Sequence, residues 1–351
     1  MSQLALIYEA QSKHVVGELP IPEPLTGYLQ VRVEAAAVNP SDYKIFDFDR
    51  TGFVKHYPAV LGWEAAGVVT KIADGEKTKY KVGDRIAFLC VPSFSVDGGT
   101  SYTSRGAFQQ YALADQRFSI KIPAGLDYAE ASSWPMAGNT AAGVFYKHLQ
   151  LKEPWVDGKD AYKGQKLVVL GGSSSVGSYA IQFALISGFE VITTASPAHF
   201  EYLKSLGANT VIDRAAPDAA AQLLAAAGGP LKYVVDAISI AATQSLAIEI
   251  LQESGFLGLV LSPAEPVKPL MEAKKVQVRF GTGLAGWYAS PALHEAAEGY
   301  FAAGTLRFNR ATVLGGLEAW EEAFEMHRKG TVSGTKIVLA PQQTRKQSSS
   351  L

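Results

Sequence analysis

The residues that most clearly suggest chemistry form a glycine- and serine-rich turn between an apolar strand and a helix, in KLVVLGGSSSVGSYAIQFA. Gly172, Ser174 and Gly177 occupy the positions of a G-x-G-x-x-G dinucleotide fingerprint, with serine in place of the second glycine. Backbone N–H groups and the helix dipole at such a helix start would hold a pyrophosphate, although a serine-rich turn without a ligand is the alternative. The turn residues expected to line this site are Gly172, Ser173, Ser174, Ser175, Val176 and Gly177.

The identity of the dinucleotide is indicated after the second strand of this region. An NAD-binding fold usually places Asp or Glu there, where the carboxylate binds the ribose 2′-hydroxyl. Here the strand ends in VITTASPAHF, which contains no carboxylate. Ser196, His199 and Arg214, with the hydroxyls of Ser173 and Ser174, could donate hydrogen bonds to a 2′-phosphate, so we expect NADPH rather than NADH. The competing role for Ser196 is that of a helix N-cap ahead of Pro197.

Length and composition limit the class of protein. The chain of 351 residues exceeds the roughly 250–300 residues at which a single core stops growing, so two domains are expected. A formal net charge of −1, with no basic or acidic block, gives no support for a nucleic acid or an anionic membrane as partner. Cys90 is the only cysteine, which excludes an intramolecular disulfide. The first residues do not resemble a signal peptide and no apolar run is long enough to span a membrane, so we expect a cytoplasmic protein.

The order of the expected elements predicts an α/β protein with two kinds of domain. Residues 1–127 carry short alternating runs separated by Gly, Pro and Asp, which is typical of a β-rich domain. Residues 128–282 alternate apolar strands with helices, which indicates a doubly wound parallel sheet. Residues 283–340 form a block of two helices and two strands that is too small to fold alone and should pack on the first domain. The polar tail, residues 341–351, is expected to be disordered.

Taken together, these motifs resemble the medium-chain dehydrogenase/reductase superfamily over nearly the whole chain. Its members join a GroES-like β-rich catalytic domain to a Rossmann domain that binds the dinucleotide, and the resemblance implies the same fold here. The segments that carry the resemblance are AVNPSDYKI, YPAVLGWEAAGVV, KVGDRIAF, GNTAAGVFY, GGSSSVGSYAIQFA, LKSLGANTVID and VSGTKIVL.

Zinc-dependent members of this superfamily bind their catalytic metal through a Cys, a His and a second Cys. On the motifs of this chain, those positions fall on Asn39, Trp63 and Met136, which do not form a zinc-ligand set. Trp63 either fills the volume of the missing metal or forms a wall of the substrate pocket. Without a Lewis acid, alcohol oxidation loses its main electrostatic contribution, whereas hydride addition to a conjugated alkene can proceed with hydrogen bonds alone stabilising the enolate.

Within the superfamily, the chain is most similar to the zinc-free quinone oxidoreductases and enoyl reductases, and among these to fungal enoyl reductases that act in trans on polyketide synthases. The resemblance implies an NADPH-dependent reductase of activated C=C bonds, in an enone or an enoyl thioester. The alternatives are an NADPH:quinone oxidoreductase and a non-catalytic NADPH-binding protein. The implied partners are an unsaturated substrate, free or carrier-tethered, and a polyketide synthase; the chain could be a monomer or a homodimer.

The resemblance also implies roles for individual residues near the nicotinamide. Lys44 is favoured as the proton donor, with Tyr43 as the rival; if this piece is a strand, only one of them can face the cleft. The alternative for Lys44 is a solvated surface lysine. Thr140 falls where relatives place a threonine near the nicotinamide, with a helix N-cap as its competing role. The implied cofactor contacts outside the glycine-rich segment also include Asn39, Pro40 and Lys336.

Three further positions have a polar side chain without assigned chemistry. Glu64 and Asp42 match polar positions that flank the zinc site of metal-dependent relatives, and here they should join the two segments through hydrogen bonds or pair with Lys44. His294 begins an H-E-x-x-E sequence that lacks the second histidine of a metalloprotease helix. We interpret it as part of an exposed helix face.

Overall fold

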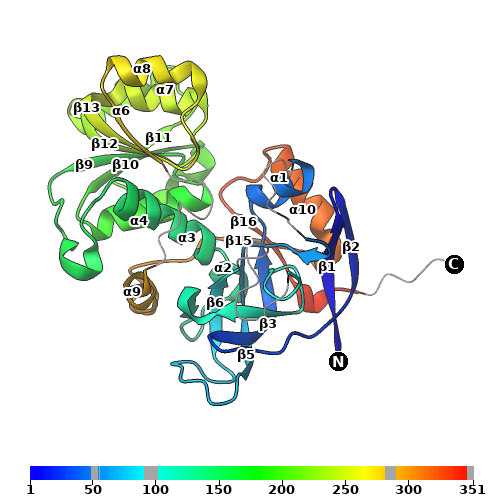
Figure 1. The fold of residues 1–351 in the computed structure, drawn as a ribbon. Helices are drawn as coiled ribbons and strands as arrows, with labels where there is room; N and C mark the ends of the chain where they lie inside the picture. Colours follow the sequence, from blue (N-terminus) through cyan, green and yellow to red (C-terminus); the bar gives the residue numbers. More distant parts are fainter. Residues whose placement is uncertain (49–53, 55, 91–101, 281–289, 346–351) are drawn as a thin grey trace. The chain divides into compact units, whose positions relative to one another are not determined.

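The computed structural model describes residues 1–48, 54, 56–90, 102–280 and 290–345, and its chain divides into two compact units (Figure 1). Unit 1 comprises residues 1–136, 297–302 and 308–351. Unit 2 comprises residues 137–296 and 303–307. No helix among the described residues has both the length and the apolar character that crossing a membrane requires.

Unit 1 is built on two mainly antiparallel sheets. Its strands are β1 (Ser2–Ala10), β2 (Lys13–Pro20), β3 (Tyr28–Ala37), β4 (Ala59–Val60), β5 (Glu64–Ile72), β6 (Arg85–Leu89), β7 (Tyr111–Asp115), β8 (Ser119–Lys121), β15 (Ala311–Gly315) and β16 (Lys336–Leu339). Over the described residues they form a three-stranded sheet, β2-β1-β4, and a seven-stranded sheet, β15-β16-β3-β5-β6-β8, in which β7 also pairs with β3. In β3 the fully buried Val31 and Val33 flank the exposed Arg32, the alternation expected of a half-buried strand.

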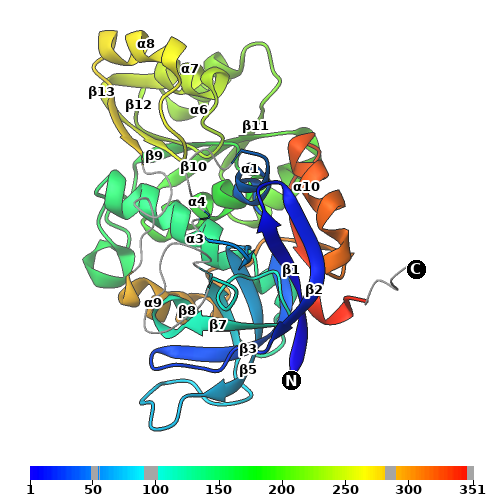
Figure 2. The same ribbon diagram turned by 45° about the vertical axis from the view of Figure 1, so that its right-hand side comes forward.

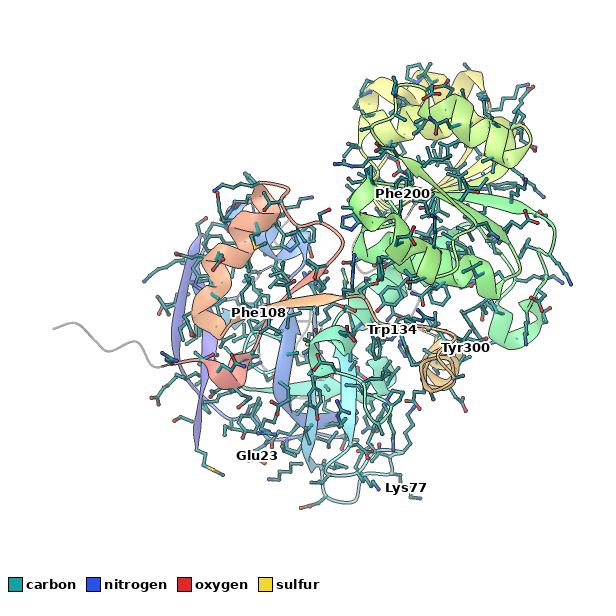
Figure 3. The ribbon with its side chains drawn as sticks, turned by 180° about the vertical axis from the view of Figure 1, so that it is seen from behind. Glu23, Lys77, Phe108, Trp134, Phe200 and Tyr300 are labelled. Carbon is teal, nitrogen blue, oxygen red and sulfur yellow. The ribbon has the colours of Figure 1, made fainter. Side chains whose placement is uncertain are left out.

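The C-terminal part of the chain completes the larger sheet of unit 1. Strand β16 pairs antiparallel with β3, with Val338 opposite Ala37, and β15 pairs parallel with β16. This pairing brings Lys336, at the start of β16, back to the end of β3. The interior of unit 1 contains the fully buried Phe108 and Trp134, whereas Lys77 lies at its surface (Figure 3).

The helices of unit 1 include one segment that the sequence allowed as a possible strand. The α-helices that lie wholly in unit 1 are α1 (Pro40–Phe48), α2 (Tyr128–Ala131) and α10 (Trp320–Arg328). Helix α1 carries Tyr43 and Lys44, so the premise of a strand at this position is wrong. It lies beside α10 (Figures 1 and 2), where the guanidinium of Arg328 bonds both carboxylate oxygens of Asp47 at 2.8 and 2.7 Å.

Unit 2 has the expected doubly wound architecture. Its strands are β9 (Lys166–Leu170), β10 (Glu190–Ala195), β11 (Thr210–Asp213), β12 (Leu231–Asp236), β13 (Leu251–Leu259) and β14 (Gln277–Phe280). All neighbours are parallel, in the order β11-β10-β9-β12-β13-β14 over the described residues. This is the Rossmann strand order, which confirms the predicted fold class. Val168, Val234 and Leu257 are fully buried in the central strands, because helices cover both faces of such a sheet.

The remaining helices follow the alternation of strand and helix that the sequence predicted. They are α3 (Trp134–Ala142), α4 (Ser175–Ile186), α5 (Phe200–Ser205), α6 (Ala219–Ala227), α7 (Ala241–Ile250), α8 (Lys268–Ala273) and α9 (Pro291–Ala302). The boundary between the two units falls inside α3 and α9. Helix α4 follows β9 directly, so the glycine-rich segment connects the first strand of the sheet to its first helix, where this fold binds a pyrophosphate.

Candidate functional site

The glycine-rich turn of unit 2 has glycine where no side chain would fit. A Cβ atom on Gly172 would lie 2.1 Å from Oγ1 of Thr193, and one on Gly177 would lie 2.2 Å from the carbonyl oxygen of Gly171. Gly171 itself has a φ of +77°, a conformation that favours glycine. The turn therefore packs closely between β9, β10 and α4. This close packing of helix on strand is the physical role of glycine in a dinucleotide fingerprint.

The serines of the same turn have different uses. Ser174 is the N-cap of α4, and its hydroxyl accepts a hydrogen bond from the N–H of Gly177 at 3.0 Å. Ser173, Ser175 and Val176 are partly exposed at the start of the helix. The first N–H groups of a helix have no partner within the helix and carry the positive end of its dipole. This end of α4 can therefore receive an anionic group such as a pyrophosphate.

The end of β10 holds a hydroxyl and a cation together. The guanidinium of Arg214 donates from Nε to Oγ of Ser196 at 2.9 Å, and Arg214 is exposed. Ser196 stands at the N-cap position before Pro197, but its side chain makes no capping hydrogen bond. His199 lies in the same short helical turn and is partly exposed. Asp213, at the end of the neighbouring β11, accepts from the N–H of Ala215 within its own turn at 3.0 Å.

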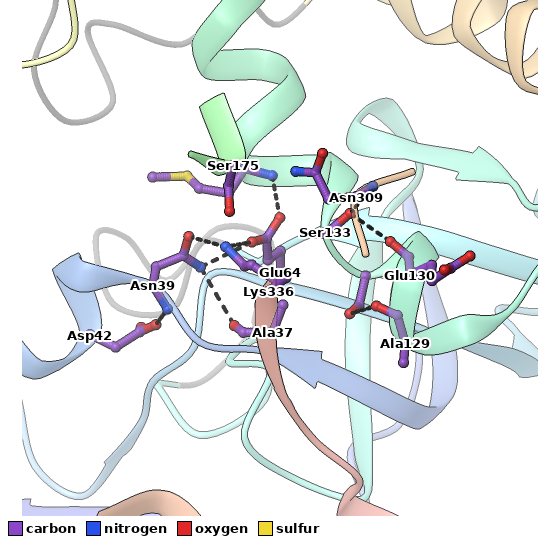
Figure 4. A network of polar contacts seen from close by, with 12 residues as sticks. Ala37, Asn39, Asp42, Glu64, Ala129, Glu130, Ser133, Ser175, Asn309 and Lys336 are labelled. Atoms are coloured by element: carbon purple, nitrogen blue, oxygen red, sulfur yellow. Dashed lines mark hydrogen bonds and ion pairs between the residues drawn. The ribbon is translucent and has the colours of Figure 1, made fainter. Parts of the chain in front are cut away.

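In unit 1, four segments that are distant in the sequence meet in a buried polar cluster (Figure 4). The Lys336 ammonium lies 2.7 Å from Oε1 of Glu64 and donates to Oδ1 of Asn39 at 2.6 Å. The Asn39 amide nitrogen donates to Oε1 of Glu64 at 3.1 Å. The backbone N–H of Met136 donates to Oε2 of Glu64 at 2.6 Å. Glu64 is fully buried and Lys336 is 3% exposed, so this ion pair is shielded from water.

Asp42 connects this cluster to helix α1. Its Oδ2 accepts from the N–H of Asn39 at 2.7 Å, and its own N–H donates to the carbonyl of Asn39 at 3.0 Å, an arrangement related to the capping box. Its Oδ1 has no hydrogen-bond partner among the residues that the structure describes. Burial raises the pKa of Asp42 to about 8, against the opposing effects of the Asn39 N–H and Lys336, so this carboxyl is mostly protonated at neutral pH.

The positions that match the zinc ligands of metal-dependent relatives do not form a metal site here. The amide of Asn39 is bound to Lys336 and Glu64, Trp63 is a buried indole and Met136 contributes its backbone N–H to Glu64. No group of three or more His, Cys, Asp or Glu side chains that could hold a metal occurs within the described part of the chain. The donor set at these positions does not fit zinc.

The candidate proton donors lie on consecutive positions of α1. Lys44 is exposed, and Tyr43 is partly buried with the guanidinium carbon of Arg328 5.8 Å from its ring centroid. Consecutive residues of a helix are about 100° apart around its axis, so these side chains leave α1 in different directions. Pro40 is the first residue of α1, where proline is well tolerated. Thr140 lies inside α3 rather than at its start, so the competing N-cap role is wrong.

Some polar residues have partners that the sequence did not indicate. The hydrogen bond expected from Glu64 to the other segment is confirmed, but the carboxyl of Asp42 bonds only to Asn39 of its own segment in the contacts of the described residues, and the cation that pairs with Glu64 is Lys336 and not Lys44. His294 is 3% exposed and its Nε2 lies 3.2 Å from Oδ1 of Asn139, so the expectation of an exposed helix face is wrong. A charged residue at the edge of an apolar strand, as in KIVL and EAAGVV, is the sequence signal that could have marked Lys336 and Glu64 as buried charges, although not as partners of each other.

Comparison with known proteins identifies the family. The chain matches two family descriptions, "Alcohol dehydrogenase GroES-like domain" over residues 26–124 and "Zinc-binding dehydrogenase" over residues 175–286. The trans-enoyl reductase himH of Aspergillus japonicus is 35% identical over 319 residues, which cover 88% of each chain. The trans-enoyl reductase RAP2 of Pyricularia oryzae is 31% identical over 271 residues, which cover 76% of this chain and 71% of the relative. A solved structure of an alcohol dehydrogenase superfamily protein from Novosphingobium aromaticivorans has a TM-score of 0.74 and 25% identity, and covers 96% of this chain and 99% of that one.

The chain therefore belongs to the medium-chain dehydrogenase/reductase superfamily, with a GroES-like and a Rossmann component. The expected membership and the likeness to fungal enoyl reductases are both confirmed. The protein is an oxidoreductase, and its family implies a nicotinamide cofactor. The glycine-rich turn of unit 2 fits the pyrophosphate of such a cofactor, because it leads directly into the N-terminus of α4, where N–H groups that have no partner within the helix and the helix dipole favour an anion.

Proposed function

We propose that this protein is an NADPH-dependent, zinc-independent reductase of activated C=C bonds. The substrate class is an enoyl thioester or an enone. The observation that carries the proposal is the likeness to proteins named trans-enoyl reductases along most of the chain, at 35% identity for himH. The donor set at Asn39, Trp63 and Met136, which does not fit zinc, agrees with a reaction that uses hydrogen bonds rather than a Lewis acid.

The choice of NADPH is supported by the end of β10. Arg214 and Ser196 form a joined pair of donors, and a 2′-phosphate would receive charge-assisted hydrogen bonds from them. His199 is close by in the chain and partly exposed. Asp213 is the nearby carboxylate, and its hydrogen bond to Ala215 directs one oxygen into its own turn. We propose that these residues select the phosphorylated dinucleotide.

Per turnover, one hydride and one proton are added across the double bond and one NADPH is oxidised. The nicotinamide, when bound, supplies the hydride to the β-carbon, and the α-carbon of the resulting enolate then takes the proton. Tyr43 and Lys44 on α1 are the proposed donors of that proton. We propose that Thr140, together with the turn residues 172–177, contacts the cofactor.

The proposed partner is a polyketide synthase that carries the unsaturated acyl chain. The names of the relatives, trans-enoyl reductase, support a separate protein that acts on a tethered substrate. An enoyl thioester on a carrier protein should then be reduced more efficiently than the same acyl group on a small thiol.

The test is to monitor the oxidation of NADPH by absorbance with three classes of acceptor, which are enoyl thioesters, enones and quinones. Enoyl thioesters or enones should consume NADPH at least about tenfold faster than quinones, a difference of about 1.4 kcal/mol in activation free energy. Turnover with quinones alone would instead identify a quinone reductase. Binding of NADPH without turnover on any acceptor would identify a binding protein, and either result would contradict the proposal.

A further inference from the structure

The family resemblance implies that Lys336 contacts the cofactor, yet its ammonium is already engaged inside unit 1. It is 3% exposed, and it contacts Glu64 and Asn39 at 2.7 and 2.6 Å. An ammonium has three donors, and these two contacts use two of them. This placement suggests that Lys336 acts on the protein rather than on the dinucleotide.

The contacts of Lys336 fix the orientation of the Asn39 amide. The Asn39 oxygen accepts from Lys336, and the Asn39 nitrogen donates to Glu64 at 3.1 Å, so both ends of the amide have specific partners (Figure 4). A reversed amide would place its nitrogen against the ammonium and its oxygen against the carboxylate. Two repulsive contacts would then replace two attractive ones.

Asn39 in turn determines where α1 starts. Its N–H donates to Oδ2 of Asp42, and its carbonyl accepts from the N–H of Asp42, which closes the first turn of the helix. Tyr43 and Lys44 follow directly in the same helix. A continuous series of contacts therefore runs from Lys336 through Asn39 to the residues proposed as proton donors.

We propose that Lys336 is a positioning residue, whose buried ammonium neutralises Glu64 and holds Asn39 so that α1 presents its proton donor in the correct place. This inference rests on the proposed function for its catalytic consequence.

The charges around the pair support Lys336 as the counter-ion of Glu64. Among the described residues, the titratable groups whose charges act on this pair are Asp42 on α1, His327 on α10 and Cys90 after β6, and the buried cation Arg105 acts on Cys90. Asp42 is mostly protonated at neutral pH, burial lowers the pKa of His327 to about 4, and burial raises the pKa of the Cys90 thiol well above its usual value. Asp42, His327 and Cys90 are therefore largely uncharged, and Lys336 is the cation whose ammonium contacts Glu64 directly, at 2.7 Å.

The experiment is a double-mutant cycle with Lys336→Met, Glu64→Gln and the combined variant, measured by thermal unfolding. Each single change leaves one buried charge without its partner and should lower the Tm by at least about 5 °C, or prevent folding. The combined variant removes both charges and should recover at least half of the larger single loss. The matched control is the exposed pair Lys13 and Glu9, 2.7 Å apart, for which Lys13→Met, Glu9→Gln and their combination should change the Tm by less than about 2 °C.

Activity and cofactor affinity separate positioning from stability. The combined variant still lacks the donor to Asn39, so its kcat should remain at least about tenfold below that of the parent, while Kd for NADPH stays within about threefold. Lys336→Arg keeps a cationic donor and should retain a kcat within about fivefold of the parent.

Three results would overturn the inference. Additive losses in the cycle, or a combined variant that folds no better than Lys336→Met, would show that the charge pair is not the source of the effect. A large loss of NADPH affinity in the combined variant would make Lys336 a cofactor ligand. A combined variant with the kcat of the parent would remove the positioning role. The unfolding and binding measurements need no substrate, so a parent protein without enoyl reductase activity would refute the proposed function and leave the charge-pair result standing.

Discussion

At the scale of single residues, two buried carboxyl groups of unit 1 behave differently because their partners differ. Glu64 accepts from an ammonium, an amide and a backbone N–H. Asp42 accepts from the N–H of Asn39, and its Oδ1 has no hydrogen-bond partner within the described residues. Burial favours the neutral form of a carboxyl unless cations and donors compensate. Glu64 is therefore suited to an ion pair, and Asp42 to a neutral capping group.

Asp42→Asn should change how stability depends on pH. The pKa of Asp42 is raised from 3.8 to about 8, so the folded state holds a proton that the unfolded state releases between these values. The stability that this proton contributes is fully present below about pH 4 and is lost as the pH rises to about 8. The introduced asparagine is uncharged at every pH, and its oxygen can still accept from Asn39. When the pH is raised from about 5 to about 8, the free energy of unfolding should therefore fall by at least about 1 kcal/mol more in the parent than in the variant.

Urea unfolding of both proteins at the two pH values measures this difference. The matched control is Asp47→Asn, also on α1, whose carboxylate is bound by Arg328 near the surface. Equal losses of stability in the parent and in Asp42→Asn would show that Asp42 is ionised in the folded protein at neutral pH.

At the scale of elements, the sequence predicted those whose pattern is local. The six apolar runs of unit 2 all form strands. For the central strands the reason is that parallel strands covered on both faces are continuously apolar. The sequence did not indicate strand β2 (Lys13–Pro20), since none of its residues is fully buried and KHVVGELP has no clear alternation. A strand at the position of α1 seemed equally compatible with the sequence, because the cap that defines the helix start depends on Asn39 and Asp42 and not on an apolar period.

Gly177→Ala should disrupt the start of α4. The added Cβ would lie 2.2 Å from the carbonyl oxygen of Gly171, so the helix start must move away from the turn. We expect a loss of about 1–3 kcal/mol in stability and at least a tenfold weaker Kd for NADPH. Gly299→Ala, inside α9, is the matched control, because the added Cβ would meet no atom within 4 Å. This substitution should stabilise the protein slightly. An unchanged Kd for Gly177→Ala, measured by nicotinamide fluorescence, would remove the turn from the cofactor site.

The identity of the proton donor can be tested on α1. Tyr43→Phe and Lys44→Met each remove one candidate proton, and the side chains lie at different angles around the helix. The true donor should show a fall in kcat of about 10²-fold or more, with little change in Kd for NADPH. If both variants keep kcat within about threefold of the parent, the proton comes from water and Lys44 is a solvated surface lysine.

At the scale of the whole molecule, each unit is assembled from separated pieces of chain. Unit 1 takes residues from both ends of the sequence, and Lys336 reaches Asn39 only because β16 pairs with β3. Composition indicates where a β-rich region gives way to alternating strands and helices. It carries no information about which distant strand a C-terminal strand will join, so the ion pair of Glu64 with Lys336 could not be predicted.

NADPH should stabilise the whole protein more than NADH. A ligand that binds only the folded state adds about 2.7 kcal/mol at one hundred times its Kd, so the shift in Tm at equal concentrations reports relative affinity. Arg214 and Ser196 lie together at the end of β10, and contacts from both to a 2′-phosphate would make the Kd for NADPH at least about tenfold lower than the Kd for NADH.

Arg214→Ala should remove most of this advantage of NADPH and leave the shift in Tm with NADH unchanged. Ser196→Asp should reverse it by placing a negative charge against the phosphate. Arg279→Ala, at an exposed arginine of β14, is the control and should change neither shift. Equal shifts with the two dinucleotides in the parent protein would refute the assignment of NADPH.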